Sequence, residues 1–140
     1  MKSVNSTDIK GHLILVAGAA SGIGREIAKN LLSKGAVVAA CDKNMEALQS
    51  FKTESSSQNL YIFKIDFLEM NSIEECVAKV ESDLGPLKAA VNCVGVLGKN
   101  GEKVELIDID DFDLVYQINL RGALVFTKSV IGGMAERGYG

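Results

Sequence analysis

Three glycines placed just before a helical pattern carry the strongest chemical signal in this sequence. Gly18, Gly22 and Gly24 follow a G-x-x-x-G-x-G spacing. Glycine permits a tight turn and lets the backbone approach a pyrophosphate closely. The amino end of the following helix presents N–H groups and a partial positive charge to phosphates. We therefore predict dinucleotide binding, and a glycine-rich turn without a ligand is the alternative; the residues expected at the pyrophosphate are Gly18, Ser21, Gly22, Ile23 and Gly24.

A carboxylate follows at the spacing that ribose recognition requires. Asp42 lies eighteen residues after Gly24, at the end of a second apolar run. A carboxylate there can accept both ribose hydroxyls of an adenosine and would repel a 2′-phosphate. Ser21 is uncharged where a basic residue could hold that phosphate, whereas Lys43 could soften the preference. These residues favour NAD over NADP, and the alternative for Asp42 is a solvated turn aspartate.

The elements that must position these residues alternate along the chain. Short apolar runs predict four strands, at 13–16, 36–41, 60–65 and 89–91. Helical spacing predicts four helices, from 23 to Gly35, then 44–53, 72–84 and about 110–134. Strands that alternate with helices imply parallel pairing with right-handed crossovers. We predict a Rossmann-like, doubly wound α/β sheet of about four strands, forming a single domain over residues 1–140.

Local signals set some of the expected boundaries. Ser72 and Glu75 have the spacing of a capping box and predict the start of the third helix, and Gly85-Pro86 predicts its end. The serine-rich segment 54–59 predicts a surface loop. Gly122 in the last helix costs about 1 kcal/mol relative to alanine, so we expect another helix to approach it closely.

Composition excludes several classes of protein. Hydrophobic residues make up 47% and the net charge is −3, so we expect a packed core and neither a nucleic-acid partner nor a membrane partner. Residues 1–8 contain no apolar segment typical of a secretory signal. Three cysteines without a C-x-x-C pair fit reduced thiols in a cytoplasmic protein, and the single histidine argues against a metal site.

Four motifs in order make the sequence resemble the short-chain dehydrogenase/reductase family. They are the glycine segment, Asp66 with Phe67, the segment 92–95 (Asn-Cys-Val-Gly), and Asn119. The resemblance implies that Asp66 and Phe67 contact the adenine and that Asn92 and Gly95 lie in the loop on the nicotinamide side. It also implies that Asn119 supports a catalytic proton relay and that the last helix packs at a dimer interface. Without the resemblance, Asn119 could equally face solvent or bind a backbone carbonyl.

Two positions depart from the family pattern. Ala17 stands where the family usually has threonine, and Cys93 stands where it usually has a second asparagine. The resemblance implies that those polar residues link the ends of the first and fourth strands. We expect neither change to disable the fold. Cys93 could be a reactive thiol, but no His or Lys lies near it in sequence, so packing is favoured.

The reaction of this family also needs a Ser and a Tyr-x-x-x-Lys motif, and neither is found here. Tyr61 and Tyr116 have no lysine four residues later, and Tyr139 is next to the last residue. The resemblance implies that the 140 residues cover about the first half of a ~250-residue domain, a normal size for one α/β domain. We expect this chain to supply the cofactor half and to be inactive alone.

Two functions follow from these expectations. One is an oxidoreductase of the short-chain type, in which hydride passes between nicotinamide and a small alcohol or ketone substrate. The other is a non-catalytic NAD-binding or interaction protein that pairs with a full-length relative. In either case the fourth strand would leave an open edge and the helix from Asp110 would expose apolar side chains, so we expect self-association.

Overall fold

A four-stranded parallel sheet organises the chain. The computed structural model describes residues 9–99, 101 and 103–140, and the expectation about residues 1–8 lies outside them. The strands are β1 (Leu13–Ala17), β2 (Val37–Asp42), β3 (Leu60–Lys64) and β4 (Ala89–Asn92). Their order in the sheet is β3-β2-β1-β4, with every pair parallel. The chain reverses its direction of winding between β1 and β4, which is the position where doubly wound sheets bind ligands.

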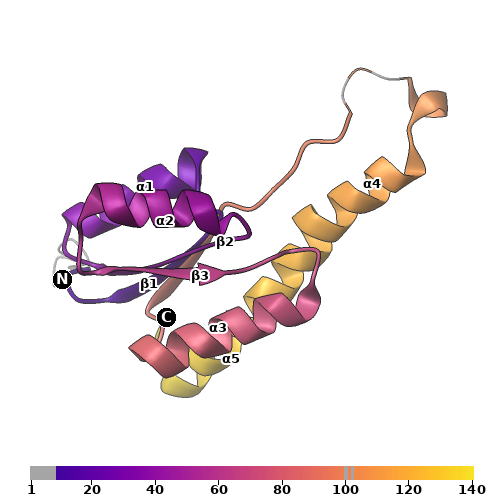
Figure 1. Cartoon of the computed structure of the whole chain (residues 1–140). Helices are drawn as coiled ribbons and strands as arrows, with labels where there is room; N and C mark the ends of the chain where they lie inside the picture. Colours follow the sequence, from indigo (N-terminus) through magenta and orange to yellow (C-terminus); the bar gives the residue numbers. More distant parts are fainter. Residues whose placement is uncertain (1–8, 100, 102) are drawn as a thin grey trace, which may run out of the picture.

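Helices cover both faces of this sheet (Figure 1). On one face lie α1 (Gly22–Ser33) and α2 (Met45–Ser55), and on the other lie α3 (Met70–Leu84) and α5 (Ala123–Arg137). Alternate strand residues supply each core: Ile14 and Val16 pack on the α1 side, whereas Leu13, Leu15 and Ala17 pack on the α3 side. The predicted α/β class, parallel pairing and four strands are therefore confirmed.

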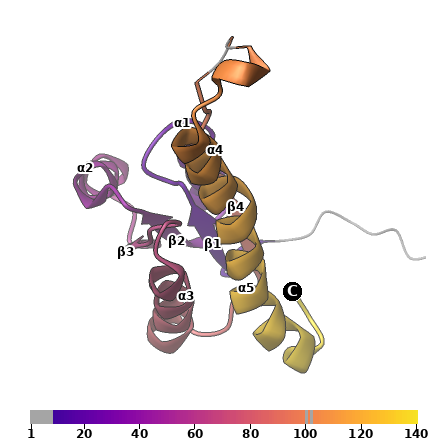
Figure 2. The same ribbon diagram turned by 90° about the vertical axis from the view of Figure 1, so that its right-hand side faces the viewer.

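The last helical pattern is longer and less regular than expected. A 3₁₀ turn (Val104–Leu106) precedes α4 (Ile109–Tyr116), and a π-helical segment (Gln117–Gly122) joins α4 to α5. Figure 2 shows α4, the π-helical segment and α5 as one continuous rod. Figure 1 shows that the α4 end of this rod projects beyond the sheet. Among the described residues, the close neighbour of Gly122 outside its own rod is a loop and not a helix, and approach by a helix of a second copy stays a prediction. A Cβ on Gly122 would lie 2.8 Å from the Phe67 ring and 3.0 Å from its carbonyl oxygen, so the loop after β3 makes the close approach.

Two expected boundaries also need correction. Helix α3 begins at Met70 with Glu69 as its N-cap, so Ser72 lies inside the first turn and is not a cap. The Ser72 hydroxyl accepts a hydrogen bond from the Asp66 N–H at 3.0 Å, because the preceding loop folds back over the helix start. Helix α2 continues to Ser55 and ends where Ser56 adopts a left-handed conformation, so the expected loop from 54 begins later.

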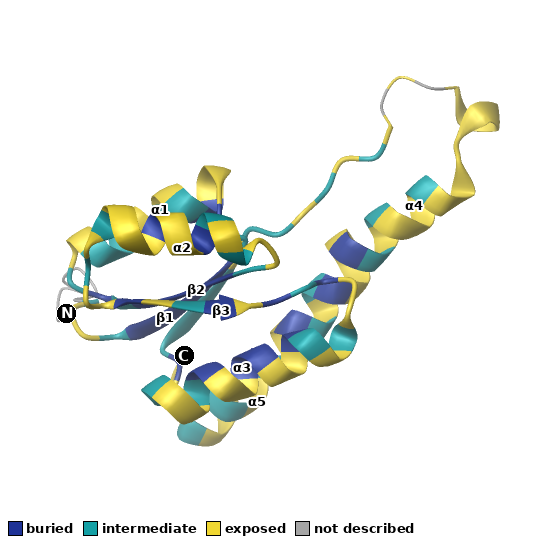
Figure 3. Cartoon of the chain, in the orientation of Figure 1, coloured by how far each residue is buried: buried dark blue, intermediate teal, exposed yellow. Residues whose placement is uncertain are grey.

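Apolar side chains remain exposed along the rod, as the sequence predicted. Phe112, Leu120, Leu124 and Ile131 are each more than half exposed (Figure 3). Strand β4 pairs only with β1 among the described residues, so one of its edges is open. No helix within the described part of the chain is long and apolar enough to cross a bilayer.

Candidate functional site

A cavity of about 440 Å³ opens at the carboxyl ends of the strands. It lies where the loops after β1, β2, β3 and β4 converge, as expected for ligand binding at the switch point. Eight of the ten residues that the sequence predicted to bind a cofactor line it: Gly18, Ser21, Gly22, Ile23, Gly24, Asp42, Phe67 and Gly95.

The glycine loop is held between the ends of β2 and β4. The Gly18 and Ala19 N–H groups both donate to the Cys41 carbonyl oxygen, at 2.8 and 3.1 Å. Gly18 has φ +82°, and a Cβ there would lie 2.9 Å from the Cys93 carbonyl carbon and oxygen. Glycine is required at this position because both the conformation and the space exclude a side chain.

The amino end of α1 is left available for an anion. Ser21 is its N-cap residue, yet the Ser21 side chain makes no capping hydrogen bond, and the first turn contains no acidic residue. The side chains of Asn44 and Asp108 cap α2 and α4, whereas α3, like α1, has no side-chain cap. Uncapped N–H groups and the helix dipole together favour a phosphate at this end.

Asp42 lies beside that helix end and is fixed in place. Its Oδ2 accepts a hydrogen bond from the Ala20 N–H at 3.1 Å, and its Oδ1 accepts one from the Asn44 N–H at 3.0 Å. These bonds hold the carboxylate at the rim of the cavity, which it lines together with Lys43. The carboxylate is therefore oriented at the cavity rim and contacts the glycine loop directly through Ala20.

Two predicted residues do not line this cavity. Asp66 faces a neighbouring cavity, and its Oδ1 accepts a hydrogen bond from the Leu68 N–H at 3.0 Å. Asn92 is exposed at the end of β4, and its Oδ1 accepts one from the Val94 N–H at 2.9 Å. Their assigned contacts with adenine and the nicotinamide side therefore stay predictions. Sequence reasoning missed Ile65, which lines the cavity because it follows β3 directly, as Asp42 ends β2.

Asn119 fastens the loop after β4 to the long rod. Its Oδ1 accepts a hydrogen bond from the Val96 N–H, and its Nδ2 donates one to the Val96 carbonyl, both at 2.8 Å. Asn119 lies within the π-helical segment, an irregularity often found at functional sites. Asn119 is exposed, and its side chain bonds a backbone N–H and a backbone carbonyl, so it holds the loop that contains Gly95.

Replacing Asn119 with alanine is expected to release this loop. Both hydrogen bonds to Val96 are lost, so the Val96 amide should exchange with solvent at least about tenfold faster, equivalent to about 1.4 kcal/mol of local stability. Hydrogen–deuterium exchange measured by NMR provides the test. Arg121→Gln, an exposed change in the same segment, serves as the control. Equal Val96 protection in both variants and in the parent chain would show that the clamp is not structural.

Cys93 behaves as a packing residue. Its Cβ would lie 3.2 Å from a Cβ placed on Gly24, so it fills space between the end of β4 and the start of α1. Burial raises the pKa of the Cys93 thiol. A raised pKa disfavours the thiolate, so the structure supports packing over nucleophilic chemistry.

None of the three tyrosines lines this cavity within the described residues. Tyr61 lies on β3 and Tyr116 ends α4. Tyr139 stacks under the Lys88 ammonium group, 4.6 Å from the ring centre. Within the described residues, the cavity is lined by the glycine loop and the Asp42 carboxylate, and by no tyrosine that could act as an acid or base.

This fold and this cavity define a nucleotide-binding domain of the Rossmann type, with the binding groups at the switch point of the sheet. Residues 12–140 match the family model for short chain dehydrogenases. The chain belongs to the short-chain dehydrogenase/reductase family, whose members are NAD(P)-dependent oxidoreductases, and the resemblance noted from the sequence is confirmed.

Individual relatives agree with this assignment. The chain is 29% identical over 139 residues to a 2,3-dihydro-2,3-dihydroxybenzoate dehydrogenase of Bacillus subtilis, covering 98% of this chain and 52% of the relative. It superposes on an actinorhodin polyketide ketoreductase with NADPH (TM-score 0.85, 34% identity, 93% and 51% of the two chains). A 3-ketoacyl-(acyl-carrier-protein) reductase from Brucella melitensis complexed with NADH is also similar (TM-score 0.86, 25% identity, 93% and 53%). The chain spans about half the length of these proteins.

Proposed function

We propose that this chain binds a nicotinamide dinucleotide in the glycine-loop cavity and prefers NAD(H) to NADP(H). The observation that supports this most directly is the fixed position of the Asp42 carboxylate beside the uncapped amino end of α1. Gly18, Gly22 and Gly24 with the α1 N–H groups would hold the pyrophosphate, and Asp42 would accept from the ribose hydroxyls. When bound, the cofactor supplies the hydride chemistry of the family.

Preference for NAD(H) follows from charge at the ribose end. The Asp42 carboxylate would repel a 2′-phosphate. Arg25, in the first turns of α1, is paired with Glu54 at 2.6 Å and lies over the Phe51 ring at 4.9 Å. Its guanidinium is thereby held toward α2, which leaves Lys43 as the basic residue lining the cavity. One similar structure contains NADPH and another contains NADH, so family membership does not decide between the two cofactors. The proposed preference for NAD(H) therefore rests on Asp42, Arg25 and Lys43 of this chain.

Titration of the chain with NADH tests the proposal directly. We expect a saturable change in NADH fluorescence, and NADPH should bind at least about tenfold more weakly, a difference of about 1.4 kcal/mol. Far-UV circular dichroism should confirm that the sample is folded. A folded sample with no saturable signal for either nucleotide would overturn the proposal.

For catalysis, we propose that these 140 residues supply the cofactor-binding half of a dehydrogenase or reductase that acts on an alcohol or ketone. Asn119 would position the nicotinamide-side loop through its bonds to Val96. No tyrosine among the described residues lines the cavity, so the pure chain should show no turnover with small alcohols or ketones. A measurable NADH-dependent rate would contradict this proposal.

Self-association is the second proposed property, and it also fits a non-catalytic NAD-binding protein that pairs with a relative. The exposed apolar rod and the open β4 edge are the supporting observations. Both features attract another chain.

We expect the chain to sediment as a dimer or larger species at micromolar concentration. The double change Leu120→Glu and Leu124→Glu places two charges on the exposed rod and should shift the sedimentation coefficient toward that of a monomer. Leu97→Glu alters a still more exposed apolar side chain in the loop after β4 and should leave the sedimentation unchanged. If the parent chain sediments only as a monomer at this concentration, the prediction is wrong.

A further inference from the structure

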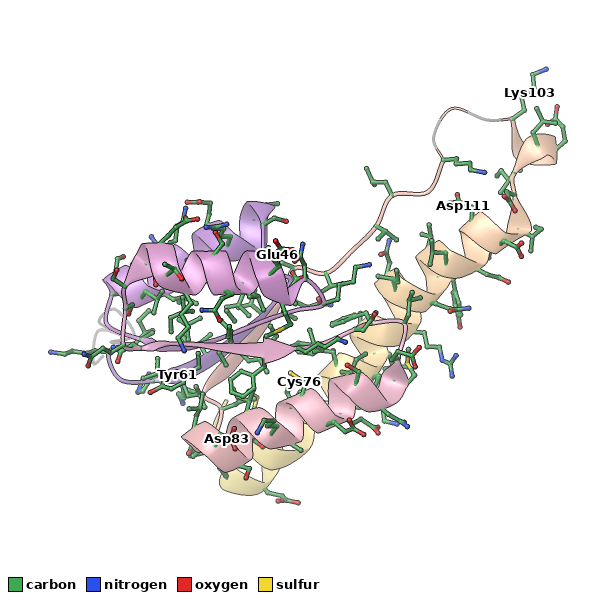
Figure 4. The ribbon with its side chains drawn as sticks, viewed as in Figure 1. Glu46, Tyr61, Cys76, Asp83, Lys103 and Asp111 are labelled. Atoms are coloured by element: carbon green, nitrogen blue, oxygen red, sulfur yellow. The ribbon has the colours of Figure 1, made fainter. Side chains whose placement is uncertain are left out.

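Two cysteines from different elements are in contact on the face of the sheet that α3 covers. Cys41 is on β2 and Cys76 is in α3, and the Cys76 thiol donates a hydrogen bond to the Cys41 Sγ atom, with 3.7 Å between the two sulfurs. Figure 4 shows Cys76 on the side of α3 that faces the sheet. A disulfide has an S–S distance of about 2.05 Å, so a side-chain rotation or small shift that brings the sulfurs about 1.7 Å closer would join them. Cys93, at the end of β4, is not part of this pair.

Both thiols are buried, and Cys76 differs from Cys41 in lining a cavity. Cys76 is 4% exposed and lines a second cavity, of about 450 Å³, between β3 and α3. The charged residues that line the same cavity are Lys64, Asp66, Glu69, Glu75 and Lys79. Cys41 is fully buried. Burial raises the pKa of the Cys41 thiol well above its ordinary value. A thiol at the wall of a cavity and a second thiol 3.7 Å from it are the two components from which oxidation can form a disulfide.

We propose that Cys41 and Cys76 form a reversible disulfide when the protein is oxidised by hydrogen peroxide. The Cys76 sulfur attacks one peroxide oxygen, the O–O bond breaks, and the first water leaves. The Cys41 sulfur then attacks the Cys76 sulfenic acid, the S–O bond breaks, and the hydroxyl leaves with the Cys41 proton as a second water. The thiol pair loses two electrons and the peroxide gains them. A metal is a weaker alternative, because the described residues place no third ligating side chain with this pair.

The pair is connected to the nucleotide cavity through the backbone of β2. The Cys41 carbonyl oxygen accepts the hydrogen bonds from Gly18 and Ala19, and Asp42 is the next residue. A disulfide that draws Cys41 toward α3 would shift both the acceptor that holds the glycine loop and the carboxylate beside it. This consequence rests on the proposed function, and we expect oxidation to weaken NADH binding by about tenfold or more.

Peptide mapping tests the disulfide independently of any nucleotide. Cleavage after Lys and Arg places Cys41, Cys76 and Cys93 in separate peptides, 35–43, 65–79 and 89–99. After peroxide treatment we expect a cross-linked species of 35–43 with 65–79, lacking two hydrogen atoms, which a reducing agent separates. Cys93→Ser should keep the cross-link and Cys76→Ser should abolish it. If the parent chain yields only uncross-linked peptides after peroxide treatment, or yields Cys76 as sulfinic acid, the proposal is overturned. This outcome is measured on the parent chain, so it does not depend on whether a variant folds.

A NADH titration of the reduced and the oxidised protein tests the link between the two sites. Weaker binding after oxidation, recovered on reduction, supports it, and equal affinity in the two states overturns it. If the reduced protein binds no NADH, the proposed function fails, while the peptide map still decides the disulfide.

Discussion

Asp42→Asn is expected to weaken NADH binding by tenfold or more and to bring the affinities for NADH and NADPH close together. The change removes the negative charge that accepts from the ribose hydroxyls and repels a 2′-phosphate, and a tenfold loss corresponds to about 1.4 kcal/mol. Asparagine keeps one oxygen, which can accept the hydrogen bond that Ala20 donates to Asp42, and it loses the bond that the Asn44 N–H donates to the other oxygen. The glycine loop should therefore hold its shape, and the loss should report on charge.

Fluorescence titration with each nucleotide gives the two dissociation constants. Asp42→Ala removes both the charge and the bond to Ala20, so it should bind NADH more weakly than Asp42→Asn. The matched control is Asp113→Asn, which changes an exposed carboxylate on α4 and should leave both affinities unaltered. If Asp42→Asn binds both nucleotides as the parent chain does, Asp42 is a turn aspartate and does not recognise ribose.

Gly24→Ala is expected to destabilise the chain by about 3 kcal/mol and to lower the Tm by about 10 °C. Gly24 lies in the first turn of α1, where alanine would ordinarily stabilise a helix by up to about 1 kcal/mol. The tertiary structure makes the effect of this alanine on stability unfavourable. A Cβ on Gly24 would overlap the Gly18 carbonyl oxygen and would lie 2.8 Å from its carbon, so α1 would have to move away from β1.

Thermal unfolding followed by circular dichroism measures this effect, and Gly22→Ala is the matched control. Gly22 has φ +53°, but a Cβ there would meet no atom within 4 Å, so its cost should be limited to about 1–2 kcal/mol of backbone strain. We expect Gly24→Ala to be the more damaging change and to abolish NADH binding. The reverse order would show that conformation, and not close packing of helix on strand, makes these glycines necessary.

The α/β class, the strands and the buried stripes of the helices could be predicted from the sequence because they depend on local periodicity. Apolar runs mark strands that are buried on both faces, and the residues buried on α3 recur at helical spacing: Ile73, Cys76, Val77 and Val80. The glycine spacing and Asp42 depend on short-range geometry at a strand end. The glycine loop and the Asp42 position could therefore be predicted without knowing which elements are neighbours in the fold.

Contacts between distant segments were decided only by the tertiary structure. The sequence predicted a helix beside Gly122, and within the chain Phe67 lies there. The sequence left the partner of Asn119 undecided, and the structure pairs Asn119 with Val96. Ser72 was predicted to cap a helix, and it accepts a hydrogen bond from the Asp66 N–H. The pairing of Cys41 with Cys76 belongs to the same class. Periodicity specifies which face of an element is buried, but a contact between two elements depends on their register and separation, which exist only once the sheet and its two helical layers have assembled.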